Sequence, residues 1–454
     1  MSRNMIKTER VPRDFGVIAW NDVPFEELLI ESRDGEWGLG EPTVGHQLCE
    51  VIRGTDFAGL HSAGIELPKR WIPDHIVDRK KLQAGDIILE TAGGTAKQST
   101  GRSALLTKNF FEKHNEFPVL CASFSRHLRL DIRKFDPGFV YYLLQALYSA
   151  GYMAVYNLQH TGVARFQYTS FKKKTVLNIP DEPTQRKISA TLSAYDDLIA
   201  SNRRRIELLE KMAEELYREW FVRFRFPGHQ QAAFNKGIPV DWKIGKLSEL
   251  VRVNPPEKVD KSETKPFVAM DDLSTDSMLF SFKEMRTGSA GSKFRNRDVL
   301  LPRITPSLEN GKRGFVMVLD EDQVGIGSTE FIVLREQALT AEYIYFLTIS
   351  KILREHAELS MTGASGRQRV QESCLDFFLV PEPPASIMKK FSEIVAPHFN
   401  ELHLLSQKER SLAATRDALL ARLISGKLPV DQLDIQLTPS MREADEALQE
   451  VAHA

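Results

Sequence analysis

The sequence predicts an α+β protein in which two similar α/β domains are separated by two long, antiparallel coiled-coil helices. Two observations predict this fold. The chain aligns with itself at a separation of about 200 residues, which indicates an internal repeat. A heptad pattern also follows each copy of the repeat, which is typical of long paired helices. We therefore expect a pseudo-twofold arrangement in which each domain is followed by its own helix.

Length and composition exclude several classes of protein. With 454 residues, 42% of them hydrophobic and 27% charged, the chain should be globular and contain at least two domains. It has no run of about 18 apolar residues that would predict a membrane span, and its polar N-terminal segment lacks the apolar core of a signal peptide. Three scattered cysteines argue against a disulfide framework and a cysteine-rich zinc site. We expect a cytoplasmic protein.

The net charge of −1 argues against a protein that binds DNA tightly on its own, because neutralisation of phosphates supplies much of the affinity of such proteins. The charge is still compatible with a DNA reader whose basic residues lie on one face. It is also compatible with a reader whose partners supply phosphate contacts.

Several landmarks recur in the same order in both halves of the chain. A gapless alignment pairs residues 158–183 with residues 359–384, and it places Gln167 opposite Gln368. Upstream, the matching segments are 85–89 with 297–301, 139–144 with 342–347, and 20–28 with 242–250. Each copy then contains short strands, a short helix, a Thr-Gly loop and an apolar strand that ends at proline. The predicted domains are residues 1–183 and 237–383.

The first long helix is predicted over residues 184–226, a stretch without proline or glycine that ends before Pro227 and Gly228. At about 1.5 Å per residue, its length is roughly 60 Å, so it needs a partner helix. Asn202 is the polar exception on its seam and would set the register of the pair. The seam positions alternate in steps of three and four residues: Ile188, Leu192, Tyr195, Ile199, Asn202, Ile206, Leu209, Ala213, Leu216 and Trp220.

The second long helix is predicted over residues 384–426, with Gly426 at its end and a kink at Pro397. Antiparallel pairing with the first helix is the simplest way to cover both apolar stripes. The alternative is that each helix packs against a different subunit. Residues 427–454 form a polar tail to which the sequence assigns no role. The second seam includes Phe391, Val395, Leu402, Leu405, Leu412, Leu419 and Leu423.

Residues 202–222, together with residues 224–228, strongly resemble the central conserved helix of the specificity (S) subunits of type I restriction–modification enzymes. Residues 394–428 are similar to the C-terminal conserved helix of that family. The duplicated layout, about residues 20–430, covers nearly the whole chain. The helix motif is specific to the family, whereas the globular parts are expected to vary with the target sequence.

The resemblance implies that each domain is a target-recognition domain that reads half of a split double-stranded DNA target. The helix pair would set the unread spacing, because a rigid spacer can hold two reading modules about one helical turn, roughly 34 Å, apart. Two modification subunits would dock and methylate adenine with S-adenosylmethionine, and restriction subunits that use ATP and magnesium would join them. The chain itself would bind no cofactor and catalyse no reaction.

Arginine contacts guanine and asparagine or glutamine contacts adenine in DNA, whereas lysine, serine and threonine hold phosphates. The duplicated polar loop therefore supplies the candidate DNA-binding residues, although a solvated turn is an equally open interpretation. The first copy offers Thr161, Gly162, Arg165 and Gln167, and the second offers Thr362, Gly363, Ser365, Arg367, Gln368 and Arg369. Secondary candidates are Lys97, Gln98, Ser99, Arg303, Lys312 and Arg313.

Three motifs suggest chemistry that the rest of the sequence does not support. Residues 254–257 resemble the catalytic tetrapeptide of adenine methyltransferases, but Glu257 replaces the aromatic residue that stacks on a flipped base. We expect a turn there. Residues 93–101 lack the spacing of a phosphate-binding loop, so a small-residue loop, with or without contact to the DNA backbone, is expected. Asp86 and Glu90 lack the following Glu-x-Lys of a nuclease, and the 11 histidines form no metal motif.

Two competing functions remain for comparison. A methyltransferase or nuclease acting alone would need a cofactor loop and a complete catalytic tetrapeptide, and the sequence has neither. A coiled-coil scaffold without sequence-specific DNA reading is the alternative, but it leaves the duplicated domains without a purpose. The sequence therefore favours a non-catalytic DNA-specificity subunit.

Overall fold

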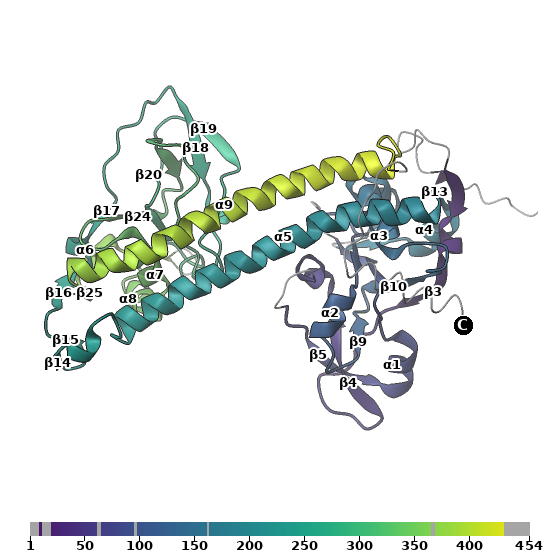
Figure 1. Ribbon diagram of the computed structural model, residues 1–454, viewed down its shortest axis with the longest axis horizontal. Helices are drawn as coiled ribbons and strands as arrows, with labels where there is room; N and C mark the ends of the chain where they lie inside the picture. The colour runs from purple at the N-terminus through teal and green to yellow at the C-terminus, as the bar shows by residue number, and fades with distance from the viewer. Residues whose placement is uncertain are drawn as a thin grey trace, which may run out of the picture. The chain divides into compact units, whose positions relative to one another are not determined.

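The computed structural model describes residues 9–10, 20–60, 65–94, 98–160, 163–364 and 368–430 (Figure 1). The chain divides into two compact units. Unit 1 comprises Met1–Ser201 and Glu409–Ala454, and unit 2 comprises Asn202–Lys408. The division passes through both long helices, so each unit contains one mixed α/β domain and one part of each helix.

The centre of unit 1 is a four-stranded antiparallel sheet in the order β3-β10-β6-β8. The side chains of its inner strand β6 are buried on both faces and alternate between them, as a strand requires. Ile87 and Leu89 pack into the core that contains helix α3 (Pro137–Ser149), while Ile88 packs into a second core. The strands are β3 (Leu29–Asp34), β10 (Ser125–Leu130), β6 (Ile87–Glu90) and β8 (Ser103–Leu105).

Three smaller sheets surround that centre, in the orders β5-β4-β9, β11-β12-β7 and β1-β13-β2. Their strands are β1 (Glu9–Arg10), β2 (Asn21–Pro24), β4 (His46–Ile52), β5 (Lys69–Pro73), β7 (Ala92–Gly94), β9 (Val119–Cys121), β11 (Asn157–His160), β12 (Val163–Phe166) and β13 (Thr175–Ile179). The helices are α1 (Asp74–Lys80), α2 (Lys108–Lys113), α4 (Tyr168–Lys174), and the 3-10 turns η2 (Phe25–Leu28), η3 (Gly54–Gly59) and η4 (Tyr152–Tyr156).

Unit 2 is built around a four-stranded antiparallel sheet in the order β17-β24-β21-β22. Its strands are β17 (Val251–Val253), β24 (Phe331–Glu336), β21 (Val299–Pro302) and β22 (Gly314–Phe315). A second four-stranded sheet has the order β19-β18-β23-β20, with β18 (Thr264–Val268), β19 (Glu284–Thr287), β20 (Ser292–Phe294) and β23 (Gly325–Gly327). The remaining strands are β14 (Phe234–Asn235), β15 (Ile238–Pro239), β16 (Lys243–Lys246) and β25 (Leu379–Glu382).

The helices of unit 2 include α7 (Ala341–Ile349), which packs on the central sheet as α3 does in unit 1. The others are α6 (Leu247–Leu250), α8 (Lys351–Leu359), η6 (His229–Gln231), η7 (Met270–Asp272) and η8 (Glu372–Asp376). In both units a short helical turn follows the first strand of an antiparallel pair, which is β2–β13 in unit 1 and β16–β25 in unit 2. The predicted internal repeat is confirmed by this shared element order.

The structure corrects the register of the repeat. The Phe166 amide donates to the Thr91 carbonyl at 2.9 Å, and the Val370 amide donates to the Arg303 carbonyl at 2.7 Å. Because Thr91 and Arg303 follow equivalent central strands, Phe166 corresponds to Val370. Gln167 therefore corresponds to Gln371, not to Gln368 as the gapless alignment predicted. The alignment was wrong because it matched residue types without a gap over residues 158–183, whereas backbone pairing determines structural equivalence.

The two long helices are α5 (Glu182–Tyr217) and α9 (Ala385–Ile424). In unit 1, Leu192 shares a hydrophobic core with Leu423, and the Arg416 guanidinium pairs with the Asp196 carboxylate. In unit 2, Arg205 pairs with Glu401, and further along α5 the Tyr217 ring packs on the Phe391 ring, with 6.4 Å between their centroids. Residue numbers rise along α5 as they fall along α9, so the predicted antiparallel pairing is confirmed within each unit.

Every predicted seam position on the two helices is buried or half-buried. The half-buried ones are Tyr195, Leu209, Leu216, Leu412 and Leu419. Asn202 is only 8% exposed, so a polar side chain does lie on the buried stripe. The heptad pattern alone therefore identified the packed faces of both helices.

The ends of the helices differ from the sequence prediction. α5 stops at Tyr217 and continues as a π-helical turn, η5 (Arg218–Val222), so the regular helix is shorter than predicted. The wider turn accompanies the burial of the adjacent aromatic rings of Trp220 and Phe221. α9 continues through Pro397, which is exposed, so the missing hydrogen bond lies on the solvated side. Across the described residues, no helix has the length and apolarity that a membrane crossing demands.

Candidate nucleic-acid interface

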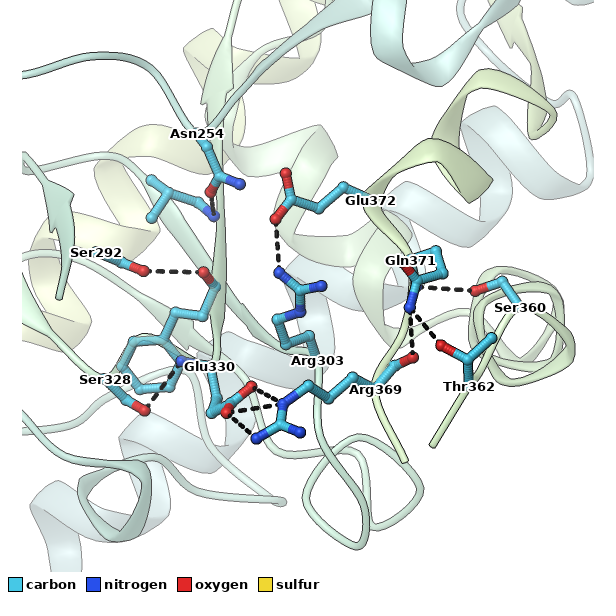
Figure 2. A network of polar contacts seen from close by, with 12 residues as sticks. Asn254, Ser292, Arg303, Ser328, Glu330, Ser360, Thr362, Arg369, Gln371 and Glu372 are labelled. Atoms are coloured by element: carbon cyan, nitrogen blue, oxygen red, sulfur yellow. Dashed lines mark hydrogen bonds and ion pairs between the residues drawn. The ribbon is translucent and has the colours of Figure 1, made fainter. Parts of the chain in front are cut away.

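A hairpin in unit 2 carries the candidate site. Thr362 and Arg369 exchange two backbone hydrogen bonds of 3.0 and 2.9 Å, and Arg369 also bridges to Ile304 beside the central sheet. The Arg369 guanidinium binds the Glu330 carboxylate through Nε, at 2.9 and 3.0 Å, and through Nη2, at 2.7 Å (Figure 2). This guanidinium holds the pKa of the Glu330 carboxyl below its ordinary value. The arginine is therefore charged, exposed and oriented.

Further polar contacts tie the hairpin to its neighbours. Gln371 donates from Nε2 to the Thr362 hydroxyl at 2.6 Å, and Arg303 donates to the Glu372 carboxylate at 2.7 Å. Figure 2 shows these side chains coming from three separate segments of the chain and meeting around Arg369. Such cross-linked loops hold polar groups in place before a ligand arrives, which reduces the entropy cost of binding.

The equivalent hairpin in unit 1 is β11–β12. Arg165 is exposed there, and its guanidinium has no hydrogen bond or ion pair with any residue that the structure describes. Close by, Arg126 stacks over the Tyr168 ring at 4.4 Å and donates to the Ser32 hydroxyl at 3.2 Å. Gln167 is half-buried beside them, and together with Arg126 and Tyr168 it lines an open depression. Unit 1 therefore presents cationic and amide groups at the same place as unit 2.

Acidic residues that suggested nuclease or methyltransferase chemistry are used by the fold. Asp86 is buried and accepts from Arg129 at 2.9 and 2.7 Å. Asp298, its equivalent in unit 2, accepts from Arg335 twice at 2.7 Å. Glu90 is likewise buried and paired with Arg102. These pairs give each carboxylate a structural role at the centre of a sheet.

The segment that resembles a methyltransferase tetrapeptide has a structural role as well. Asn254 adopts a left-handed conformation at the end of β17, and its Oδ1 accepts from the Val333 amide at 2.8 Å. Glu257 accepts from Arg295 at 2.8 Å and Arg335 at 2.6 Å, and these guanidinium groups hold its pKa below the ordinary value. The bend that the sequence predicted here is present, and its side chains connect neighbouring strands.

Comparisons with known proteins agree with this geometry. No family model matches the chain. Over 274 residues it is 25% identical to the type I restriction enzyme MjaIX specificity subunit of Methanocaldococcus jannaschii, which covers 58% of this chain and 62% of the relative. Over 171 residues it is 31% identical to the EcoEI specificity subunit of Escherichia coli, which covers 35% of this chain and 28% of the relative. The chain resembles type I restriction specificity subunits.

The matches span less than two thirds of the length of these two relatives. Among solved structures, the type I restriction–modification S subunit from M. genitalium matches with a TM-score of 0.55 at 16% identity, over 90% of this chain and 96% of that chain. This likeness shows that the chain has the fold of an S subunit, with two similar α/β domains and two long helices.

Within this S-subunit fold, some secondary candidates already have partners. Lys312 pairs with Asp271 at 3.2 Å and donates to a backbone carbonyl. Arg313 donates to the carbonyls of Thr275 and Gly311, and its Nε is buried without a partner among the described residues. Arg313 therefore serves mainly to hold its own loop. In unit 1, the Ser99 carbonyl accepts from the Tyr148 hydroxyl at 2.9 Å.

The structure describes some of the predicted DNA-binding residues and not others. Gln368 pairs through its backbone with Thr305, and Gly363 has a positive φ of 125° in the hairpin turn. Lys97, Thr161, Gly162, Ser365 and Arg367 lie outside the described residues. Gln98 lies at an isolated β-bridge position.

Sequence reasoning missed Glu330, Phe124, Arg126 and Gln371. Their place beside the hairpins depends on strand pairing between residues far apart in the chain. The recurrence of an Arg-x-Gln triplet, at 165–167 and at 369–371, is the one sequence signal that could have corrected the register and identified Gln371.

Proposed function

We propose that this chain is the non-catalytic specificity subunit of a type I restriction–modification complex and that it reads a bipartite double-stranded DNA target with a fixed spacer. The observation that carries the proposal is the duplicated hairpin, which presents an exposed arginine, Arg165 or Arg369, opposite the segment that follows the equivalent central strand in each unit. Arginine in such a position suits contact with guanine edges or with phosphates.

The length of the helices supports a fixed spacer. α5 alone has 36 residues, which at about 1.5 Å per residue corresponds to roughly 54 Å. This exceeds the roughly 34 Å of one turn of B-DNA, the separation that suits two modules reading the same face. We propose that the antiparallel helices hold the two half-sites at a set distance, so that binding to one half raises the effective concentration of the other.

The partners in this proposal are two modification methyltransferase subunits and the restriction subunits. The methyltransferases would dock on the exposed faces of the long helices, where Leu208 and Met212 lie one turn apart with 42% and 58% of their surface exposed. They would carry S-adenosylmethionine, and the restriction subunits would carry ATP and magnesium, so this chain needs no cofactor. Its cysteines at 49, 121 and 374 are free thiols, which suits action in the reducing cytoplasm.

The test is co-expression of the chain with its modification subunits, followed by mapping of methylated adenines on genomic DNA. We expect one split motif with methylated adenine in both halves. Methylation by the isolated chain would overturn the non-catalytic assignment. Absence of methylation in every combination would favour the scaffold alternative.

A further inference from the structure

One position beside the hairpin is structurally equivalent in the two units but chemically different. The Thr91 amide donates to the Phe124 carbonyl at 2.8 Å, and the Arg303 amide donates to the Glu330 carbonyl at 2.8 Å. These equivalent hydrogen bonds make Phe124 the counterpart of Glu330. In the same way, Arg165 pairs with Ala92 in its sheet where Arg369 bridges to Ile304. The residue pair Phe124 and Arg165 thus corresponds to the pair Glu330 and Arg369.

The two units share part of the framework around this position. Both units keep a buried Asp–Arg pair in the central sheet, and both keep a glutamine two residues after the arginine. The partner of the arginine differs, and so do two neighbours, because Thr91 and Arg126 of unit 1 correspond to Arg303 and Ile332 of unit 2. Unit 2 has an ion pair there, whereas unit 1 has Phe124, which is 62% exposed, and an arginine without a partner among the described residues. Different side chains around an equivalent arginine on a shared backbone framework are what different half-site sequences require.

The geometry of the ion pair restricts how Arg369 can bind. Glu330 is 21% exposed and occupies the edge of the guanidinium formed by Nε and Nη2, whereas Arg369 is 47% exposed. Nη1 has no hydrogen bond to a described residue. The end of the guanidinium therefore remains available, with Nη1 and the second hydrogen of Nη2. Two donors in this arrangement match the O6 and N7 acceptors of guanine in the major groove.

We propose that this residue pair determines specificity in each half-site, an inference that rests on the proposed function. Arg369, held by Glu330, binds a guanine in one half-site with the end of its guanidinium. Arg165 binds a guanine in the other half-site, and Phe124 provides an apolar face for the neighbouring base, where a thymine methyl fits best. Glu330 is a positioning residue, since it acts through Arg369.

The experiment maps methylated motifs from the assembled complex with its modification subunits. Arg369→Ala should lose discrimination at one G·C pair of one half-site by about 10- to 100-fold, because a bidentate arginine contact contributes that much. Arg165→Ala should do the same in the other half-site only. Arg369→Gln should move the preference at its position from guanine to adenine, because glutamine pairs with adenine.

Two further variants separate positioning from general charge effects. Glu330→Gln has only one acceptor oxygen, so it should weaken discrimination at the base pair that Arg369 reads and at no other. The matched control is Arg286→Ala, which removes an exposed arginine of unit 2 held by Glu284 through Nε at 2.6 Å and Nη2 at 2.8 Å. It should leave the motif unchanged.

The outcomes distinguish this inference from the proposed function. If the wild-type complex methylates a split motif and the arginine variants keep that motif unchanged, base reading by these residues is overturned and the proposed function stands. A uniform loss of methylation at all sites, without any relaxed base, would make the arginines phosphate contacts and would also overturn the inference. Absence of any wild-type motif would overturn both. Melting temperatures of the exposed-site variants should match wild type.

Discussion

At the scale of single residues, the buried Asp–Arg pairs are the most consequential feature of each domain. The Asp298 side chain is 1% exposed, and its carboxylate accepts two hydrogen bonds from Arg335 and one of 2.7 Å from the Arg295 amide. Asp86 accepts the same set from Arg129 and from the Gln83 amide in unit 1. Because a buried carboxylate needs all of these donors, removal of the arginine leaves a charge without compensation.

We expect Arg335→Met to lower the free energy of unfolding of unit 2 by about 3–5 kcal/mol, because it strands the Asp298 carboxylate in the sheet. Urea denaturation measures the loss. Arg286→Met removes an exposed pair and the stacking of Arg286 on the Phe267 ring, and it should cost much less. Equal losses in the two variants would contradict the role assigned to the buried pair.

A second prediction concerns His127. Its two ring nitrogens are buried and have no hydrogen-bond partner among the described residues, and burial lowers its pKa below the ordinary 6.5. The neutral form is therefore native, and the unfolded chain binds the extra proton more readily. The free energy of unfolding of unit 1 should then fall as the pH drops from about 6.5 towards the lowered pKa of His127 in the folded protein.

His127→Leu should remove this part of the acid sensitivity and raise stability, since two unsatisfied polar atoms disappear. Unfolding free energies at pH 7.5 and 5.5 test it. His75→Leu is the matched control, because it removes an exposed histidine of the same unit. A His127→Leu variant that loses as much stability in acid as the wild type would show that the proton binds elsewhere.

At the scale of secondary-structure elements, the long helices are stabilised by one apolar face each. Leu402 and Leu404 stand two residues apart on α9, yet the first is 0% exposed and the second is 62% exposed. The difference follows from helical periodicity, since positions two apart point to opposite sides. It also provides a matched pair of substitutions.

We expect Leu402→Ala to cost about 2–5 kcal/mol of unfolding free energy, because it leaves a cavity against the core of unit 2 that contains Ile206 and Phe391. Leu404→Ala should change stability by less than about 0.5 kcal/mol. Chemical denaturation of both variants is the measurement. A large loss from Leu404→Ala would mean that another chain covers this face of α9 even when the protein is purified without its partners.

At the scale of the whole molecule, the helix pair is the element through which the proposed spacing can be altered. Inserting four residues after Ser201 and four after Lys408 adds about one turn to each helix, roughly 6 Å, while preserving antiparallel pairing. The methylation map should then show both half-sites unchanged and a spacer longer by about two base pairs. Unchanged spacing would contradict the helix pair as a ruler.

An insertion in only one helix is the control for this experiment. It shifts the seam of α5 against that of α9 and should lower stability, since apolar positions no longer face each other. If the single insertion lengthened the spacer as cleanly as the double one, the two helices would not act as a pair.

The sequence by itself determined the packed faces of both long helices, the duplication of the domain and the absence of a complete methyltransferase tetrapeptide. Each of these depends on local periodicity, on order along the chain or on the identity of single residues such as Glu257, and these are readable without coordinates. The heptad seam from Ile188 to Trp220 is buried or half-buried at every position, as the pattern requires.

Only the tertiary structure decided the register of the repeat and the composition of the candidate site. Gln371, not Gln368, corresponds to Gln167 because hydrogen bonds between strands align them. Arg369 meets Glu330 because two segments 39 residues apart in sequence are brought together beside the ends of β21 and β24. Contacts of this kind depend on which strands pair and in what register, and no local pattern of residues specifies that choice.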